Sequence, residues 1–313
     1  MRTPSITWSD LFVNGTLIDY SVHLWRARVQ LTAVDLGIKD SEEVKKAISF
    51  GCFRLAPSEA FDDINAVVRA WERDIKYHSL AFPLLTGVRY VPDSEVKQLE
   101  EKLKQHLFEF KKMVSAFIQK YSTIKNEMLP VIKTALQDAA QSEIDAAEAF
   151  SRVCEEYPEE DVVSEKFNIE WNFFTISIPS SKQAAVLAKK AAPQIQQVLS
   201  SMVTELRNEL TARVSTLIDM TKKIKDGSSR FSGLNPKNIQ STMDILNRVD
   251  NLNFFDDTTI RRQVSNLKRI LENDNVDQIL VGLTEAKEII SKDVEEAVAK
   301  ARVKIGKRKL ILG

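Results

Sequence analysis

The sequence predicts a mainly all-α fold organised around a long antiparallel coiled-coil hairpin. Within residues 94–156, and again within residues 180–225, apolar residues recur at alternating steps of four and three, which is typical of a coiled-coil seam. Between these two arms, aromatic and β-branched residues of the segment 165–180 alternate with polar ones, a pattern that favours a strand. We therefore expect a hairpin with a small β-like tip, packed on a base of N- and C-terminal helices.

The composition is that of an ordinary globular protein. Hydrophobic residues make up 43% of the 313 residues and charged residues 28%, so the chain can bury a core and is not typical of disordered proteins. Lysine plus arginine equals aspartate plus glutamate at 44 each, and this zero net charge disfavours wrapping of a nucleic-acid backbone. Cys52 and Cys154 lie far apart in the sequence and indicate neither a metal-binding knuckle nor a disulfide framework.

Apolar runs in the chain are short. None approaches the ~20 residues that are needed to cross a bilayer. The first ten residues, MRTPSITWSD, also lack the apolar centre of a signal peptide. Both observations favour a cytoplasmic protein with reduced thiols.

Residues 1–93 are predicted to form a helical base with an extended turn. Apolar residues of the segment 15–36 lie roughly on one helical face, and the residues 40–43 (DSEE) resemble a capping box that would start a short helix. Ser58 can cap a further helix, which should end near His78 because its apolar residues recur at steps of three and four up to that point.

A turn and a short extended segment are predicted to follow that helix. The segment 82–92, FPLLTGVRYVP, places two prolines and a glycine around β-branched and aromatic residues. This segment would lead the chain from the base into the first arm of the hairpin.

The first arm is predicted to be one helix from Ser94 to about Glu156, roughly 90 Å long at 1.5 Å per residue. Pro130 should kink it or remove one backbone hydrogen bond, and the Ala-rich stretch 135–149 would let a partner helix approach closely. The expected seam consists of Leu103, Leu107, Phe110, Val114, Phe117, Tyr121, Ile124, Met128, Val131 and Ala135.

The segment between the arms is predicted to contain two strand-like pieces separated by a bulge or bend, because its alternation changes phase. The residues that alternate in the first phase are Ile169, Trp171 and Phe173, and those in the second phase are Phe174, Ile176 and Ile178.

The second arm is predicted to begin at a capping box formed by Ser180 and Gln183 and to end near Lys225. Its apolar positions are Ala188, Ala191, Ile195, Leu199, Met202, Leu206, Leu210, Val214, Leu217 and Ile224. Three further helices are expected at residues 236–251, 258–273 and 276–301, and a basic tail after them could be a short strand or a frayed end. The predicted domains are thus residues 1–93, 94–226 and 227–313.

Motifs that carry catalysis do not occur in the sequence. No stretch matches the phosphate-binding GxxxxGK loop, the GxGxxG loop or the GxSxG elbow of hydrolases. The three histidines, His23, His78 and His106, do not form a pair at metal-ligand spacing. We therefore expect a protein that is not an enzyme and that needs no cofactor or metal.

Two segments are candidate binding sites. The first is an apolar tip, which could instead pack on itself or insert into a membrane, and it consists of Trp171, Phe173, Phe174, Ile176 and Ile178. The second is a basic tail, which could be solvated or could contact an acidic partner or nucleic acid, and it includes Lys304, Lys307, Arg308 and Lys309. An acidic run over residues 155–161 is either a solvated helix end, a weak cation site or a docking point for a basic partner.

The order of several motifs resembles domain-of-unknown-function family 3150 of bacteria and phages. These motifs, between Gly15 and Pro179, are GTLIDYSVHLW, LTAVDLGI, FRLAPSEAF, FPLLTGVRYVP, MLP and YPEEDVVSEKFNIEWNFFTISIP. The resemblance implies no activity and no catalytic residue. It does imply an association with a MoxR-like AAA+ ATPase and a von Willebrand A-type protein.

The leading functional hypothesis from the sequence is a non-enzymatic interaction or adaptor protein that works beside such a separately encoded ATPase. Two alternatives stay open: a helical, membrane-active or pore-forming protein, and a structural phage component that assembles through the coiled coil.

Overall fold

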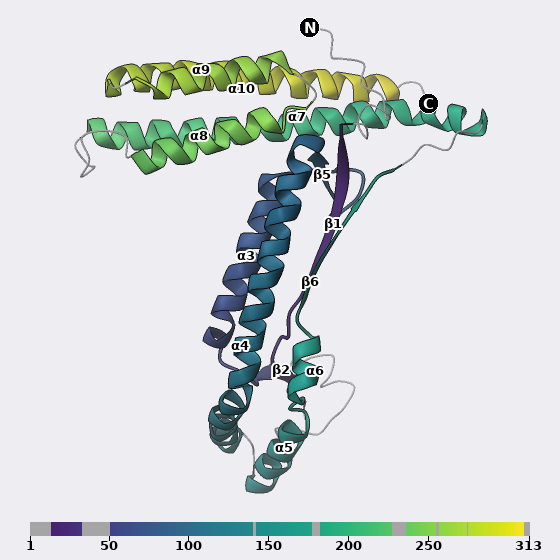
Figure 1. Ribbon diagram of the computed structural model, residues 1–313, viewed down its shortest axis with the longest axis vertical. Coiled ribbons are helices and arrows are strands. Elements are labelled where there is room, and N and C mark those ends of the chain that lie inside the picture. Colours follow the sequence, from purple (N-terminus) through teal and green to yellow (C-terminus); the bar gives the residue numbers. More distant parts are fainter. Residues whose placement is uncertain are drawn as a thin grey trace. The chain divides into compact units, whose positions relative to one another are not determined.

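The computed structural model describes residues 14–32, 51–139, 142–176, 182–226, 236–254, 257–273 and 275–309 (Figure 1). The protein is 71% helical and has a small antiparallel sheet, which confirms the mainly all-α class. Among the described residues the helices are η2 Ser58–Phe61, α3 Asp62–Tyr77, α4 Asp93–Ala139, α5 Glu143–Glu155, α6 Glu160–Glu165, α7 Lys182–Lys225, α8 Pro236–Asn251, α9 Thr258–Leu271 and α10 Val276–Lys309. The strands are β1 Gly15–His23, β2 Arg28–Gln30, β3 Cys52–Arg54, β4 Leu80–Ala81, β5 Arg89–Pro92 and β6 Asn168–Phe174.

The start of the described chain is extended and not helical, so the helix predicted over residues 15–36 is wrong for residues 15–32. Its place is taken by β1 and β2. In β1, Thr16, Ile18, Tyr20 and Val22 put a β-branched or aromatic residue at every second position, a strand period that outweighs the weak helical spacing. The short helix predicted from the residues 40–43 lies outside the described residues.

The small sheet has the strand order β4-β5-β1-β6. β5 pairs antiparallel with β1, with Gly15 opposite Pro92, and it also pairs antiparallel with β4. The turn and extended segment predicted at residues 82–92 are therefore confirmed, and Gly87 takes the left-handed backbone conformation that the turn requires, with φ of 83°. A second antiparallel pair joins β2 to β3.

The first predicted arm is divided into two helices. α4 continues through Pro130 and ends at Ala139, and α5 begins at Glu143. Ser142 has an extended backbone and its side chain accepts a hydrogen bond from the Asp145 N–H, so it caps α5 and starts a separate helix. The acidic run 155–161 follows the end of the predicted arm and leads into a short helix that was not predicted, α6.

The buried seam of α4 shifts by one residue after Met128. Val131 is 58% exposed, whereas Ile132 and Leu136 are buried. The predicted positions Val131 and Ala135 assumed a further step of three, but the helix here buries residues at successive steps of four. Because four residues exceed the 3.6 residues of one turn, each such step rotates the buried face around the helix by about 40°.

The described contacts divide the chain into two compact units. The first unit comprises Met1–Asp19, Ile75–Glu100 and Asn172–Gly313, and the second comprises Tyr20–Asp74 and Glu101–Trp171. This grouping differs from the three domains predicted from the sequence, which stay a prediction.

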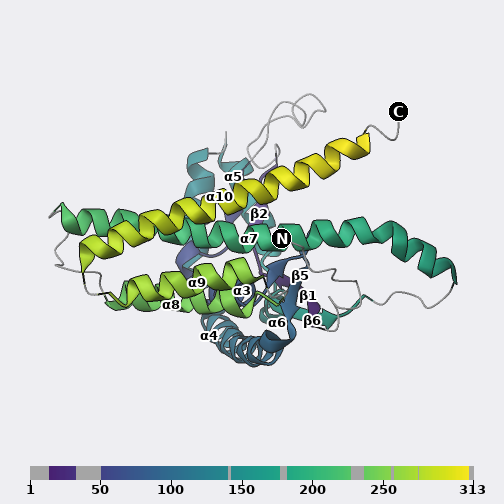
Figure 2. The same cartoon turned by 90° about the horizontal axis from the view of Figure 1, so that it is seen from above.

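In the first unit, the seam of α7 is buried by the three C-terminal helices. α9 and α10 lie over α8 and α7 (Figures 1 and 2), and α10 packs along α7 and α9. The apolar side chains that α7 contributes to this core are Val198, Met202, Leu206, Leu210, Val214, Leu217 and Ile218. α7 therefore begins and ends as predicted to within two residues, but it packs on α8 and α10 and shares its core with α9.

In the second unit, the seam of α4 packs into an aromatic cluster. The ring of Phe117 lies 5.1 Å from that of Phe61 and 5.6 Å from that of Phe167, and the ring of Trp25 lies 5.6 Å from that of Tyr121. The two heptad-bearing helices thus bury their seams in different cores. The predicted coiled-coil hairpin, in which these seams would face each other, is not confirmed.

The last helix is longer than predicted. α8 matches the predicted range, α9 ends at Leu271, and α10 continues to Lys309 instead of ending near residue 301. The basic tail is therefore helical up to Lys309.

Gly15 tests the packing of β1 against β5. An added Cβ at this position would collide with the backbone oxygen of Val91 and the ring of Tyr90, so we expect Gly15→Ala to lower the free energy of unfolding by about 1–3 kcal/mol. At Gly51 an added Cβ would meet no described atom within 4 Å, so Gly51→Ala is the matched control. Urea unfolding measures both, and equal stability of the two variants would contradict this close fit of β1 to β5.

Candidate docking surface

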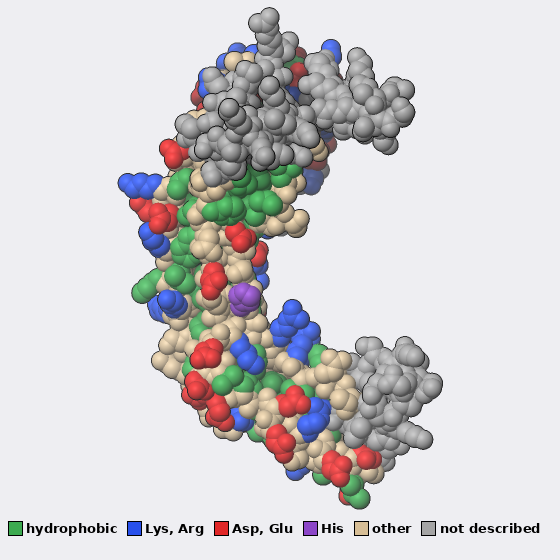
Figure 3. Space-filling model, turned by 90° about the vertical axis from the view of Figure 1, so that its right-hand side faces the viewer, with side chains coloured by type: hydrophobic (Ala, Val, Ile, Leu, Met, Phe, Trp, Pro, Cys, Tyr) green, Lys and Arg blue, Asp and Glu red, His purple; other side chains and the backbone are tan. Residues whose placement is uncertain are grey.

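The residues predicted to form an apolar tip lie in and after β6. Trp171, Phe173 and Phe174 belong to the strand and are half-buried, whereas Ile176 follows it with 38% of its surface exposed. Ile178 lies outside the described residues. Figure 3 shows hydrophobic side chains gathered over the upper part of the sheet. Partner binding by these residues stays a prediction.

β6 is held in the sheet and its aromatic residues do not share one surface. The Thr16 hydroxyl donates to the Phe174 carbonyl at 2.8 Å, and Phe174 packs against the core of the first unit. Because successive side chains of a strand point to opposite faces, Trp171 and Phe173 lie on the other face from Phe174. Within β6 the two phases predicted from the sequence thus lie on opposite faces, and the role of these residues in binding a partner stays a prediction.

The predicted basic tail belongs to α10 as far as its backbone is described. Lys304, Lys307, Arg308 and Lys309 fall in the last turns of that helix. Their side chains lie outside the part of the structure that is described, so their role in binding also stays a prediction.

The outer face of α4 carries a further surface, which was not predicted from the sequence. Phe108 is 71% exposed, and Lys104, Lys111 and Lys112 are exposed at positions i−4, i+3 and i+4 from it, so they surround its ring on the helix surface. We call these four residues the α4 patch. Residues 102–125 contain six lysines and one glutamate, which makes this part of α4 strongly basic in a chain of zero net charge.

An apolar groove of about 380 Å³ runs beside the α4 patch, between α4 and α6. We call it the α4–α6 groove. Phe110, Val114 and Ile118 line it from α4, and Ser164 and Phe167 line it from the other side. Phe167 also belongs to the aromatic cluster, so the floor of the groove is the outer surface of the core of the second unit.

Ionic contacts from α3 hold α4 next to the patch. The Asp74 carboxylate lies 3.2 Å from Lys102 Nζ and 2.8 Å from His106 Nε2. Burial would raise the pKa of Asp74, but the hydrogen bonds and positive charges of His106 and Lys102 outweigh burial and hold this pKa below its ordinary value of 3.8. These contacts fix the helix that presents Phe108.

Beyond the groove, α4 also contacts the residues before α6. The Tyr121 hydroxyl donates to the Pro158 carbonyl at 2.7 Å. Burial raises the pKa of Tyr121 to about 12, with further contributions from the negative charges of Glu159 and Glu160. The start of α6 therefore brings acidic side chains close to α4.

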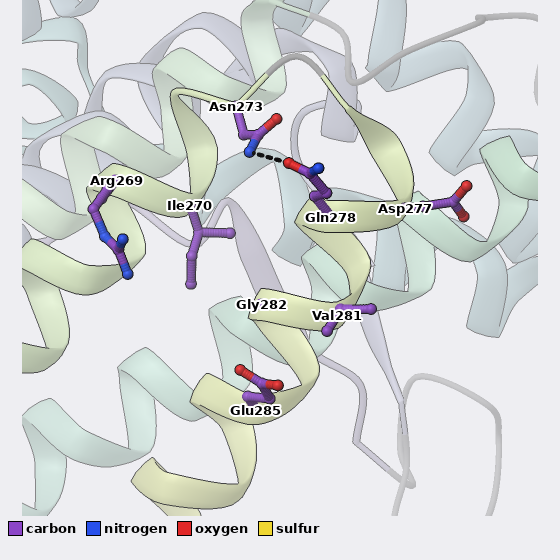
Figure 4. A pocket seen from close by; sticks show the side chains of 8 residues that line it. All are labelled: Arg269, Ile270, Asn273, Asp277, Gln278, Val281, Gly282 and Glu285. Atoms are coloured by element: carbon purple, nitrogen blue, oxygen red, sulfur yellow. Dashed lines mark hydrogen bonds between the residues drawn. The ribbon is translucent and has the colours of Figure 1, made fainter.

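In the first unit, a buried histidine lies within hydrogen-bond distance of a buried glutamate. His78 Nδ1 lies 2.5 Å from Glu95 Oε2, and the side chains are only 1% and 6% exposed. Neither residue lines the α4–α6 groove or the pocket drawn in Figure 4. The pair joins the residue after α3 to the first turn of α4, which supports a structural role.

A buried arginine donates hydrogen bonds to the last carbonyls of α3. Arg248 donates to the carbonyls of Tyr77 at 2.5 Å and Lys76 at 2.7 Å, and it pairs with Glu209. The last carbonyls of a helix have no partner within the helix, so this arginine supplies the donors that they need. The cluster joins α3, α7 and α8.

Figure 4 shows a pocket of about 460 Å³ between α9 and α10. Arg269 and Glu285 place opposite charges around it. A Cβ added at Gly282 would lie 3.1 Å from the Ile270 side chain, which shows how closely the two helices approach. The pocket accompanies this helix crossing, and we assign it no ligand.

Within the described ranges, no group of three or more His, Cys, Asp or Glu side chains is arranged to hold a metal ion. Cys52 and Cys154 are both free thiols. No described helix is both long and apolar enough to cross a membrane.

Comparison with known proteins identifies one family. The model of a family described as Protein of unknown function (DUF3150) matches residues 14–284. The match confirms the resemblance seen between Gly15 and Pro179 and extends it through α8 and α9 into α10. No curated protein and no solved structure matches the chain.

The pH dependence of stability tests the anchoring of α4. We expect Asp74→Asn to lower the free energy of unfolding near neutral pH by about 1.5–3 kcal/mol, because hydrogen bonds to a charged carboxylate are lost. The folded pKa of Asp74 is lowered, so its contribution is present above its ordinary value of 3.8 and is lost as the pH falls through the folded pKa. The difference between wild type and variant should therefore shrink below about pH 4.

Chemical denaturation at a series of pH values measures that difference. Glu127→Gln, which neutralises an exposed carboxylate on the same helix, is the control. A wild-type-to-variant difference that stays constant from pH 7 to about pH 3 would rule out the stabilising role of Asp74.

Proposed function

The chain belongs to the family Protein of unknown function (DUF3150), and we propose that it is a non-enzymatic interaction protein that binds an acidic partner through the α4 patch. The observation that carries this proposal is the exposure of Phe108 within a ring of lysines. Exposed charged residues are common, but a large aromatic side chain that is 71% exposed in such a setting has an unfavourable contact with water.

The two kinds of side chain in the α4 patch supply different parts of a binding interaction. Aromatic residues are common energetic centres of protein interfaces, because they bury a large rigid area at a small loss of conformational entropy. Lysines around such a centre raise the association rate of an acidic partner and disfavour a basic one. The patch therefore supports recognition of a protein surface with an apolar pocket or groove and an acidic rim.

The family resemblance supports the identity of the partner. We propose that the partner is a separately encoded MoxR-like AAA+ ATPase, with a von Willebrand A-type protein in the same assembly, and that the protein works in the cytoplasm. In this proposal the ATPase performs the chemistry and the present chain provides binding. The proposal does not require the predicted coiled-coil pairing of α4 with α7, because the patch lies wholly on α4.

Capture of the ATPase by full-length protein tests the proposal. We expect Phe108→Ala to weaken capture by a factor of ten or more, since loss of a central aromatic residue commonly costs an interface at least 2 kcal/mol. Ile144→Ala is the matched control, because Ile144 is equally exposed at 71% but lies on α5 beside acidic residues. Surface plasmon resonance with immobilised ATPase gives both dissociation constants.

The proposed site is contradicted if Phe108→Ala and Ile144→Ala bind as wild type does. Trp171→Ala combined with Phe173→Ala, measured in the same experiment, tests the site predicted from the sequence. Loss of binding in that variant alone would move the site to β6. Binding of anionic lipid vesicles by wild type, with no binding of the ATPase, would contradict a protein partner.

A further inference from the structure

We infer that the outer edge of β6, the side of this strand that faces away from β1, pairs with the same edge of a second copy of this chain across a two-fold axis at Trp171. This inference goes beyond the proposed function, because it does not involve the α4 patch. It follows from the position of β6 in the sheet, from the direction of its backbone groups and from the order of its side chains.

β6 lies at one edge of the four-stranded sheet. β1 is its neighbour on one side, and among the described residues no strand pairs with its other side (Figure 1). Edge strands are commonly short or carry proline or lysine, because their unpaired backbone groups otherwise bind further strands. The seven residues of β6, NIEWNFF, include no proline, glycine or lysine. The strand therefore offers about 23 Å of backbone without these protective features.

The opposite edge of the sheet is protected. β4 has only two residues, and the backbone N–H of one of them, Ala81, donates to the Glu205 carboxylate at 3.0 Å. A strand that approached this edge would have to displace Glu205 from that hydrogen bond. The two edges thus differ, and β6 is the edge that is suited to pairing.

The backbone groups of Ile169, Trp171 and Phe173 point away from β1. The Phe174 carbonyl points toward β1, because it accepts a hydrogen bond from the Thr16 hydroxyl. The N–H and C=O of one strand residue point to the same side, and those of the next residue point to the opposite side. Every second residue before Phe174 therefore presents a donor and an acceptor at the outer edge.

One antiparallel register lets the whole strand pair with itself. With Trp171 opposite the same residue of the second copy, Ile169 lies opposite Phe173 and Glu170 lies opposite Asn172. All outward-pointing residues then meet outward-pointing residues, which allows about six hydrogen bonds between the copies. The opposed apolar side chains on one face, and the carboxylate opposite an amide on the other, are favourable cross-strand pairs.

Shifts of this register are less favourable. An axis at Glu170 places this carboxylate opposite its own copy, and like charges that are directly opposite destabilise a sheet. An axis at Asn172 leaves the first two residues of β6 beyond the strand of the other copy. The side-chain order therefore selects the axis at Trp171, and a two-fold contact of this kind closes after two copies.

Charge at position 172 tests the pairing in the full-length protein. We expect Asn172→Lys to lower the dimer dissociation constant at least about threefold, because each new ammonium lies opposite Glu170 of the other copy. Asn172→Glu places carboxylates opposite each other and should raise the constant at least about fivefold. Thr175→Lys adds the same charge at an exposed residue just after β6 and should leave the constant unchanged. Sedimentation equilibrium from about 1 to about 300 µM measures all four proteins.

Disulfide trapping locates the axis. In a background of Cys52→Ser and Cys154→Ser, Trp171→Cys should give a disulfide-linked dimer, because opposite residues of a hydrogen-bonded pair have Cα atoms about 5.5 Å apart. Glu170→Cys is the control. In this register residue 170 lies diagonal to its own copy, at about 7–8 Å, which is too far for a disulfide.

A wild-type protein that stays monomeric over the whole concentration range would overturn the inference. A dimer that both Asn172 variants leave unchanged, or one that is trapped through position 170 and not through position 171, would overturn it as well. Capture of the ATPase depends on Phe108 and is measured separately. Failure of the β6 pairing and failure of the proposed function are therefore distinguished.

Discussion

Burial of the α4 seam in the aromatic cluster is the constraint on which the second unit depends. Trp25, Phe61 and Phe167 come from separate parts of the chain, and all meet Phe117 or its neighbours on this helix. Because successive helical residues are about 100° apart, a helix that buries Phe110 turns Phe108 about 160° away, toward water. The exposed aromatic residue and the floor of the groove are thus two consequences of one packing arrangement.

Polar contacts restrict where the helices can lie, and the apolar cores supply the main driving force. Asp74 holds α4 through Lys102 and His106, and Arg248 satisfies the carbonyls at the end of α3. Buried charges without partners are strongly unfavourable, so these pairs disfavour other registers of the helices. A docking surface benefits from such restriction, since a rigid surface loses less entropy on binding.

The sequence predicted the helices well and their partners poorly. α7 and α8 begin and end within two residues of the predicted positions, because a long apolar period and caps are local signals. The pairing of the two seams could not be predicted, since a seam such as Leu206, Leu210 and Val214 shows only that one face is buried. The α4 patch was missed because Phe108 lies outside the seam; lysines at i−4, i+3 and i+4 around an off-seam aromatic residue were the available signal.

By itself the sequence determined the mainly helical class, the family, the extended turn at residues 82–92 and most helix positions. These depend on periodicity, turn residues and motifs, which act over a few neighbours in the chain. Tertiary structure alone decided that α7 shares a core with α8, α9 and α10, that β6 joins a sheet, and that Phe108 stands exposed beside a groove. The reason is that an apolar face is stabilised by burial against any complementary apolar face, so only the whole fold selects which face becomes its partner.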